Sequence, residues 1–107
     1  AEFAPEDYTI VDNTVPIAMS VICYPNPFNP STTIRFTVPV QNWVKLSIYH
    51  ISGQKVCDLL TEQMAAGSYS ISWNGIDNWG RHVSAGTYVA LVQSGFGNFS
   101  VKMLYLK

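Results

Sequence analysis

The stretch SYSISW at residues 68–73 alternates serine with large apolar side chains. Successive side chains of a strand point to opposite faces of its sheet, so Tyr69, Ile71 and Trp73 are expected to face a core while the serines face solvent. The Ala66-Gly67 pair before it is a turn signal. The pattern predicts a half-buried antiparallel strand.

The same alternation of apolar and polar residues occurs in other stretches on both sides of this one. Ile34, Phe36 and Val38 alternate with polar residues, and so do the apolar residues of 44–49. Strands are predicted over residues 20–24, 33–38, 44–49, 55–60, 69–73, 87–93 and 99–106. Residues 59–66 are the one stretch that suggests a helical turn, with an irregular loop as the alternative. We therefore expect an all-β fold, an immunoglobulin-like or fibronectin-III-like antiparallel β-sandwich of about seven strands.

The composition of the chain excludes several classes of function. The 107 residues suffice for one domain, and 48% hydrophobic against 12% charged residues indicates a packed core. A net charge of -1 gives no basic stripe for a phosphate backbone, so nucleic acid is not an expected partner. No run of 18 apolar residues is present, so we expect no membrane insertion.

The beginning of the chain differs from the rest. Residues 1–20 are acidic and interrupted by Pro5 and Pro16, which predicts a linker, with a first edge strand near Tyr8 to Val11 as the alternative. Ala1-Glu2-Phe3 is compatible with a cloning scar. The sandwich domain is expected over residues 21–107.

A proline-rich segment follows the first predicted strand of the sandwich. Its residues are Pro25, Asn26, Pro27, Phe28, Asn29 and Pro30. Three prolines remove backbone donors and fix φ, so no central strand can continue here. The segment is predicted to be a sheet edge or a rigid turn.

Aromatic residues are expected mainly in structural roles. Tyr69 and Tyr88 each follow a glycine by two residues, which suits a turn with positive φ and then an inward aromatic ring, as in a tyrosine corner. Trp73 is expected to anchor the core. Trp43 and Trp79 are candidates for exposure, and an exposed tryptophan is a platform on which sugar rings stack.

No catalytic or cofactor-binding pattern is recognisable. The sequence lacks a nucleophile elbow, a paired-carboxylate site and a glycine-rich phosphate loop. Cys57 could act as a nucleophile with His50 or His82, but a single cysteine in a strand is more often packed or bridged. We therefore expect a protein that is not an enzyme and needs no cofactor.

Metal binding is not expected either. Asp77 is the one carboxylate in the loop of residues 74–80, whereas calcium takes six to eight oxygen ligands. Cys23 and Cys57 lack the spacing of a zinc site. They form either one disulfide or two buried thiols.

Four segments together resemble a known family. They are YPNPFNPSTTIRF at 24–36, VKLSIYHISGQKV at 44–56, AAGSYSISWNGIDNWG at 65–80 and SAGTYVALVQ at 84–93. In this order they resemble the C-terminal sorting domains of proteins exported by the type IX secretion system, in the PNPFNPST variety. The related immunoglobulin-like domain of the flagellar hook-capping protein shares the WNG and AGTY signatures. The resemblance covers about residues 22–107, with Cys23 and Cys57 as departures from the usual pattern.

The resemblance implies a role in export. Such a domain directs an upstream cargo protein across the outer membrane to the medium or the cell surface, with a secretion translocon and a sortase-like peptidase as partners. Cleavage is expected in the predicted linker between about Glu6 and Ser20, because a peptidase needs an extended, accessible backbone. The strand that the translocon reads corresponds to Lys102, Met103, Leu104, Tyr105, Leu106 and Lys107. We expect recognition through its exposed edge, whose unpaired backbone groups add to a partner sheet.

Two other functions stay open on the sequence. One is a structural spacer like the hook-cap domain, and the other is a carbohydrate-binding accessory module of a secreted enzyme.

Overall fold

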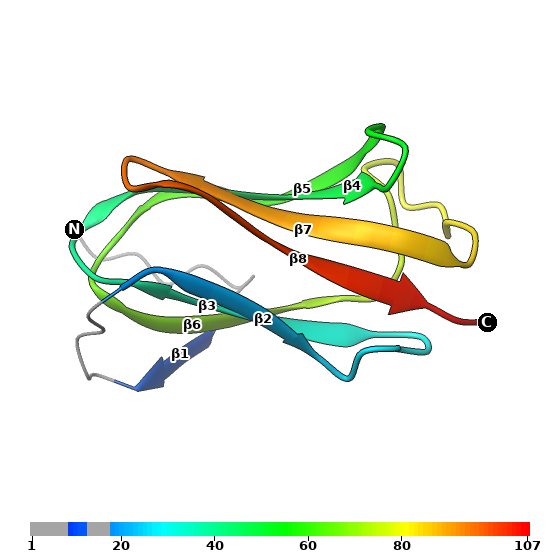
Figure 1. Ribbon diagram of the computed structural model, residues 1–107, viewed down its shortest axis with the longest axis horizontal. Coiled ribbons are helices and arrows are strands. Elements are labelled where there is room, and N and C mark those ends of the chain that lie inside the picture. Colours follow the sequence, from blue (N-terminus) through cyan, green and yellow to red (C-terminus); the bar gives the residue numbers. More distant parts are fainter. Residues whose placement is uncertain (1–8, 13–17) are drawn as a thin grey trace.

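Two four-stranded sheets face each other in the computed structural model, which describes residues 9–12 and 18–107 (Figure 1). Eight strands make up these sheets, and the predicted all-β sandwich is confirmed. The strands are β1 Thr9–Asp12, β2 Ser20–Tyr24, β3 Thr32–Val38, β4 Asn42–His50, β5 Lys55–Met64, β6 Gly67–Trp73, β7 Gly86–Ser94 and β8 Gly97–Tyr105.

The strand order shows how the chain crosses between the sheets. One sheet has the order β1-β6-β3-β2 and the other the order β5-β4-β7-β8, with every neighbouring pair antiparallel. Because β3 pairs with β6 and β4 with β7, sequence neighbours are distributed over both sheets, as in Greek-key sandwiches. β8 is thereby left at an edge.

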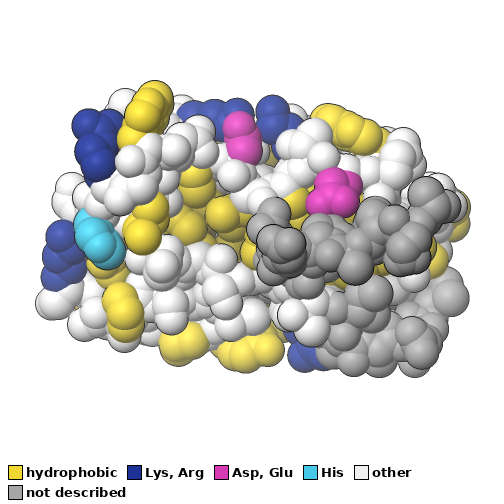
Figure 2. All heavy atoms as spheres, turned by 180° about the vertical axis from the view of Figure 1, so that it is seen from behind, with side chains coloured by type: hydrophobic (Ala, Val, Ile, Leu, Met, Phe, Trp, Pro, Cys, Tyr) yellow, Lys and Arg dark blue, Asp and Glu magenta, His cyan; other side chains and the backbone are white. Residues whose placement is uncertain are grey.

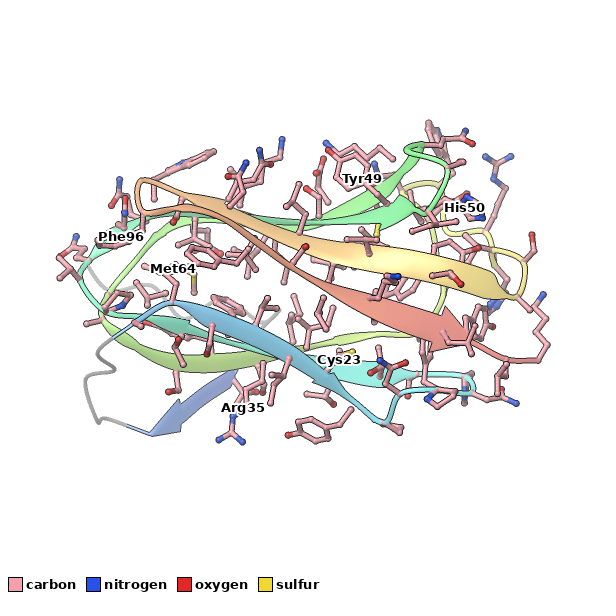
Figure 3. The ribbon with its side chains drawn as sticks, in the orientation of Figure 1. Cys23, Arg35, Tyr49, His50, Met64 and Phe96 are labelled. Carbon is pink, nitrogen blue, oxygen red and sulfur yellow. The ribbon has the colours of Figure 1, made fainter. Side chains whose placement is uncertain are left out.

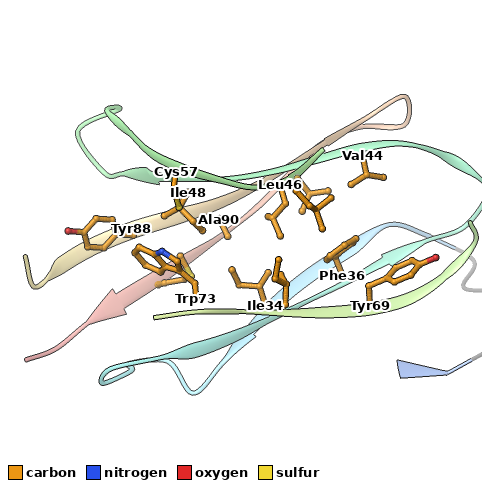
Figure 4. Close-up of a cluster of buried hydrophobic side chains, with 14 of the residues drawn as sticks. Ile34, Phe36, Val44, Leu46, Ile48, Cys57, Tyr69, Trp73, Tyr88 and Ala90 are labelled. Atoms are coloured by element: carbon orange, nitrogen blue, oxygen red, sulfur yellow. The ribbon is translucent and has the colours of Figure 1, made fainter. Parts of the chain in front are cut away.

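The core lies between the sheets and is built by the predicted alternation (Figure 4). Ile34 and Phe36 of β3 face Leu46 and Ile48 of β4, and all four side chains are inaccessible to solvent. Arg35, between the first two in the sequence, points away from the core (Figure 3). Burying one such side chain stabilises the fold by about 1.5 to 3 kcal/mol.

Strand β5 is longer than the sequence indicated. It runs to Met64, so the helical turn or loop expected over residues 59–66 is wrong for most of that stretch. The pairing with β4 shifts register twice, between Leu46 and Ser47 and again between Ile48 and Tyr49. At the second shift Val56 and Cys57 are both buried although they are adjacent. A β-bulge of this kind breaks the period of two on which recognition of a strand depends.

Part of the predicted linker is a strand. Thr9–Asp12 forms β1 and pairs with β6, which agrees with the alternative of a first edge strand. Strand β2 begins at Ser20. Residues 1–8 and 13–17, including the suggested cloning scar and much of the predicted cleavage region, lie outside the described residues.

Charged side chains do not dominate the face of the molecule that is opposite to the view of Figure 1. Seen from behind, acidic and basic side chains are scattered, and hydrophobic side chains are visible between the two sheets (Figure 2). Within residues 9–12 and 18–107 no helix is long and apolar enough to cross a membrane.

Two tyrosines tie loops to the sheets. The hydroxyl of Tyr88 donates to the carbonyl of Ser84 at 2.6 Å, and that of Tyr69 donates to Ala65 at the same distance. Both rings are buried, and this burial raises the pKa of each phenol. Each tyrosine bonds four residues back along the chain, which is the geometry of a tyrosine corner.

The corner at Tyr88 gives a stability prediction. Tyr88→Phe removes the donor to the Ser84 carbonyl, and we expect it to lower the free energy of unfolding by about 1 to 2 kcal/mol. Tyr24→Phe is the control, because the Tyr24 side chain is half exposed. Urea unfolding followed by tryptophan fluorescence measures both. Equal stability of the two variants would contradict a structural role for the Tyr88 hydroxyl.

Candidate functional site

The predicted recognition strand alternates between core and solvent. Met103 and Tyr105 are buried, with 1% and 4% of their surface accessible. Lys102, Leu104, Leu106 and Lys107 are exposed. The strand therefore contributes to the core with one face and offers Leu104 and the following Leu106 on the other, with Lys102 before them and Lys107 after them in the sequence.

The proline-rich loop lies along the outer edge of this strand. The backbone N–H of Phe28 donates to the Leu104 carbonyl at 2.9 Å, and the N–H of Leu106 donates to the Phe28 carbonyl at 3.0 Å. The side chain of Asn26 completes the contact, because Nδ2 donates to the Lys102 carbonyl at 2.8 Å and Oδ1 accepts from the Leu104 N–H at 3.0 Å. Four hydrogen bonds close the edge.

This arrangement corrects the expected mode of recognition. The edge of β8 is not open from Lys102 to Leu106, because the loop already occupies the backbone groups that a partner strand would need. By the period of two, the outward backbone groups nearer the start of β8 belong to Asn98 and Ser100. In the part of the chain that the structure describes, β8 has β7 as its one neighbour within the sheet.

Phe28 fixes the loop in the core. Its side chain is 2% accessible and stacks on Tyr105, with ring centroids 4.9 Å apart. Its ring centroid also lies 5.7 Å from that of Trp73, at a tilt of 56°. These contacts join the loop to β8 of one sheet and to β6 of the other.

The turn after β6 packs against the ring of Tyr105. Gly75 has φ of +76°, a conformation that other residues rarely adopt, and a Cβ there would lie 3.0 Å from the Tyr105 ring. The indole N–H of Trp73 donates to the Ile76 carbonyl at 3.0 Å. The proline-rich, WNG and C-terminal segments therefore meet at one place.

At the opposite edge of the sheet, an asparagine also occupies backbone groups near the start of β5. The backbone N–H of Asn78 donates to the Val56 carbonyl of β5 at 3.3 Å, and Asn78 Oδ1 accepts from the Asp58 N–H at 3.2 Å. Neither asparagine contact could be predicted from the local sequence, since each joins residues 20 or more positions apart. The one feature of the sequence that pointed to these contacts was that Asn26 and Asn78 lie in the segments 24–36 and 65–80, which resemble a known family.

Asp77, the carboxylate weighed for calcium, serves its own loop. Oδ1 accepts from the backbone N–H groups of Trp79 and Arg81, each at 2.9 Å, and Oδ2 lies 3.3 Å from Nε of Arg81. The backbone N–H of Arg81 is the largest cause that holds the pKa of Asp77 below its usual value. Among the described residues no group of three or more His, Cys, Asp or Glu side chains could hold a metal ion.

The disulfide left open by the sequence is not formed. Cys23 and Cys57 are free thiols. Cys23 points from β2 toward the space between the sheets (Figure 3), and its thiol lies 3.8 Å from the Lys102 carbonyl. Cys57 belongs to β5, at the edge of the other sheet that lies farthest from β8. The strand order thus separates the two residues.

Known proteins place the chain in a family. Residues 30–97 match the family described as the FlgD Ig-like domain. The chain belongs to this family. The matched residues begin at Pro30 and end at Gly97, so Asn26, Phe28 and nearly all of β8 lie outside the part that defines the FlgD Ig-like domain.

Two solved structures of Porphyromonas gingivalis proteins share the fold. Dimeric latent PorU is 25% identical, with a TM-score of 0.63, over 90% of this chain and 10% of the PorU chain. PorZ, an essential bacterial surface component of the type IX secretion system, is 18% identical, with a TM-score of 0.55, over 81% of this chain and 11% of its own. The chain thus corresponds to about a tenth of each. No curated protein matches it.

The asparagine contact to β8 can be tested by mutation. Asn26→Ala removes two hydrogen bonds and leaves two backbone groups of β8 without partners, so we expect a loss of about 1 to 3 kcal/mol in the free energy of unfolding. Exchange of the Leu104 amide hydrogen should become faster. Asn29→Ala, in the same loop, is the matched control. Indistinguishable unfolding and exchange in the two variants would show that the Asn26 side chain does not hold the edge.

The thiols should differ from ordinary reactive cysteines. Burial is the main cause that raises the pKa of Cys57 from 9.0 to about 11, so about one molecule in ten thousand carries the thiolate at neutral pH. We expect iodoacetamide to modify Cys57 only after unfolding. Stability should also fall as the pH rises from 9.0 toward about 11, because the unfolded chain releases this proton first. Rapid labelling of native Cys57 at pH 7 would contradict its burial.

Proposed function

We propose that this chain is a non-catalytic C-terminal module that directs the secretion of an upstream cargo protein through the type IX system and its attachment to the cell surface. Its fold is that of the FlgD Ig-like domain, and segments of similar structure occur in PorU and in PorZ, a surface component of that system. The motifs of residues 24–36, 65–80 and 84–93 support the same role.

The observation that carries the proposal is the way in which β8 is held. Leu104 and Leu106 are 39% and 47% exposed, although leucine favours burial. The clamp formed by Asn26 and Phe28 fixes the backbone under both leucines. A partner thus meets a preorganised pair of apolar side chains between two lysines, and it loses little conformational entropy in binding them. In this mechanism the outer-membrane translocon binds the side chains of Leu104 and Leu106, and the sortase-like peptidase cleaves the chain before the sandwich.

The test is export of a reporter fused ahead of residues 1–107. We expect surface delivery, with loss of the domain, in cells that have the type IX system and retention in a translocon-deficient mutant. The double variant Leu104→Ser/Leu106→Ser should lower delivery about tenfold or more, since it removes apolar contact worth roughly 1.4 kcal/mol or more.

A matched double variant separates recognition from folding. Val40→Ser/Ile51→Ser also replaces two exposed apolar side chains, which belong to the β3–β4 and β4–β5 connections and not to β8. It should be exported like the original domain, and thermal unfolding should show that both double variants remain folded. Delivery that is independent of the translocon, or undiminished delivery of the Leu104→Ser/Leu106→Ser variant, would refute the proposed signal.

A structural spacer is the second candidate. The FlgD Ig-like match covers residues 30–97 without the clamp, so the family fold by itself needs no recognition strand. Equal retention of the fusion in the periplasm of both strains would favour this function.

A further inference from the structure

A groove opens at the end of the sandwich where β4 turns into β5. Its volume is about 540 Å³, and the residues that line it come from the β4–β5 turn, from the loop after β6 and from the start of β7. His50, which lines one wall, lies at the end of the molecule that also holds the C-terminus (Figure 3). At the same end, on the left in Figure 2, a histidine lies beside basic side chains.

Trp79 is presented to this groove by a fixed loop. Its side chain is 74% exposed, the highest value among the large hydrophobic residues that the structure describes. The Asp77 carboxylate binds the backbone on both sides of Gly80, and the Gly80 N–H donates to the Asp77 carbonyl at 3.0 Å. The loop therefore keeps its shape without any contribution from the indole ring to the core.

A second wall supplies neutral polar groups. Nδ1 of His50 lies 2.9 Å from the Ser52 hydroxyl and 3.1 Å from the Ser52 backbone nitrogen. The His50 ring meets Tyr88 edge to face, with centroids 5.2 Å apart. Gln54 and Ser84 also line the groove. The side chains of Ser52, Gln54 and Ser84 offer uncharged hydrogen-bond donors and acceptors.

The charged groups of the groove are paired within the protein. Arg81 contacts Asp77 and lies over the Trp79 ring, with 5.4 Å from its guanidinium carbon to the ring centroid. Lys55 binds Asp58 at 2.7 Å, and this contact is the largest cause that lowers the pKa of Asp58. The groove thus combines an exposed aromatic ring with uncharged polar groups, and its lysine and its arginine each have a carboxylate partner in the protein.

We propose that this groove binds a neutral carbohydrate. The C–H groups on the face of a sugar ring carry slight positive charge and pack against the negative face of an indole, while the hydroxyls bind neutral donors and acceptors. An acidic ligand would need unpaired cations, and a peptide strand would need an open sheet edge, whereas Asn78 closes the edge of β5 beside the groove. The inference does not depend on the proposed sorting role.

Intrinsic fluorescence tests the proposal on the whole chain. Trp43→Phe leaves Trp79 as the exposed indole, and Trp79→Phe leaves Trp43, which lies at the other end of β4. Each protein is titrated with linear oligosaccharides of glucose, mannose, xylose and N-acetylglucosamine, and with oligogalacturonate as the acidic probe. We expect a neutral sugar to shift the emission of the original protein and of Trp43→Phe, but not that of Trp79→Phe.

Calorimetry on Trp79→Ala completes the test. Its affinity for the responding sugar should fall about tenfold or more, with an unchanged melting temperature because the ring is exposed. The proposal is overturned by any of three results: no response to the neutral sugars up to about 10 mM, a response to oligogalacturonate alone, or binding that survives in both Trp79 variants.

Discussion

The burial of Phe28 is the contact on which the arrangement of this end of the molecule depends. Phe28 comes from a loop, yet its ring contacts both Tyr105 of one sheet and Trp73 of the other. Removing such a ring from a core costs about 3 to 5 kcal/mol. The same residue binds the edge of β8 through its backbone, so side chain and main chain together hold the last strand in place.

Edge strands are a general difficulty of open sandwiches, because their unpaired N–H and C=O groups invite association. Here one asparagine serves each edge of the β5-β4-β7-β8 sheet, Asn26 at β8 and Asn78 at β5. A carboxamide holds both a donor and an acceptor, so Asn26 alone binds a carbonyl and an N–H of the strand as a peptide group would. The neighbouring prolines lack an N–H, which keeps the loop from extending into a further strand that would leave a new edge.

The sequence predicted what repeats and missed what occurs once. Alternation identified the strands around Ile34, Leu46 and Ile71, since a half-buried strand repeats its pattern every two residues. It failed at the bulge in β5, where the period is interrupted. The residues of the C-terminal strand were identified, but the closure of its edge by Asn26 was not. That contact joins positions 76 and 78 residues apart, and no local pattern encodes such a distance.

Aromatic contacts connect the C-terminal strand with the groove. Tyr105 stacks on Phe28, which meets Trp73, and Trp73 in turn packs edge to face against Tyr88, whose ring contacts His50 in the groove wall. A partner that pulled β8 out of its sheet would have to break this series of contacts and expose Phe28 to water. A partner that binds Leu104 and Leu106 on the surface of the folded domain leaves these aromatic contacts intact and Phe28 buried. For the proposed sorting role, the cost of disturbing Phe28 therefore favours a partner that binds the folded domain over one that extracts its last strand.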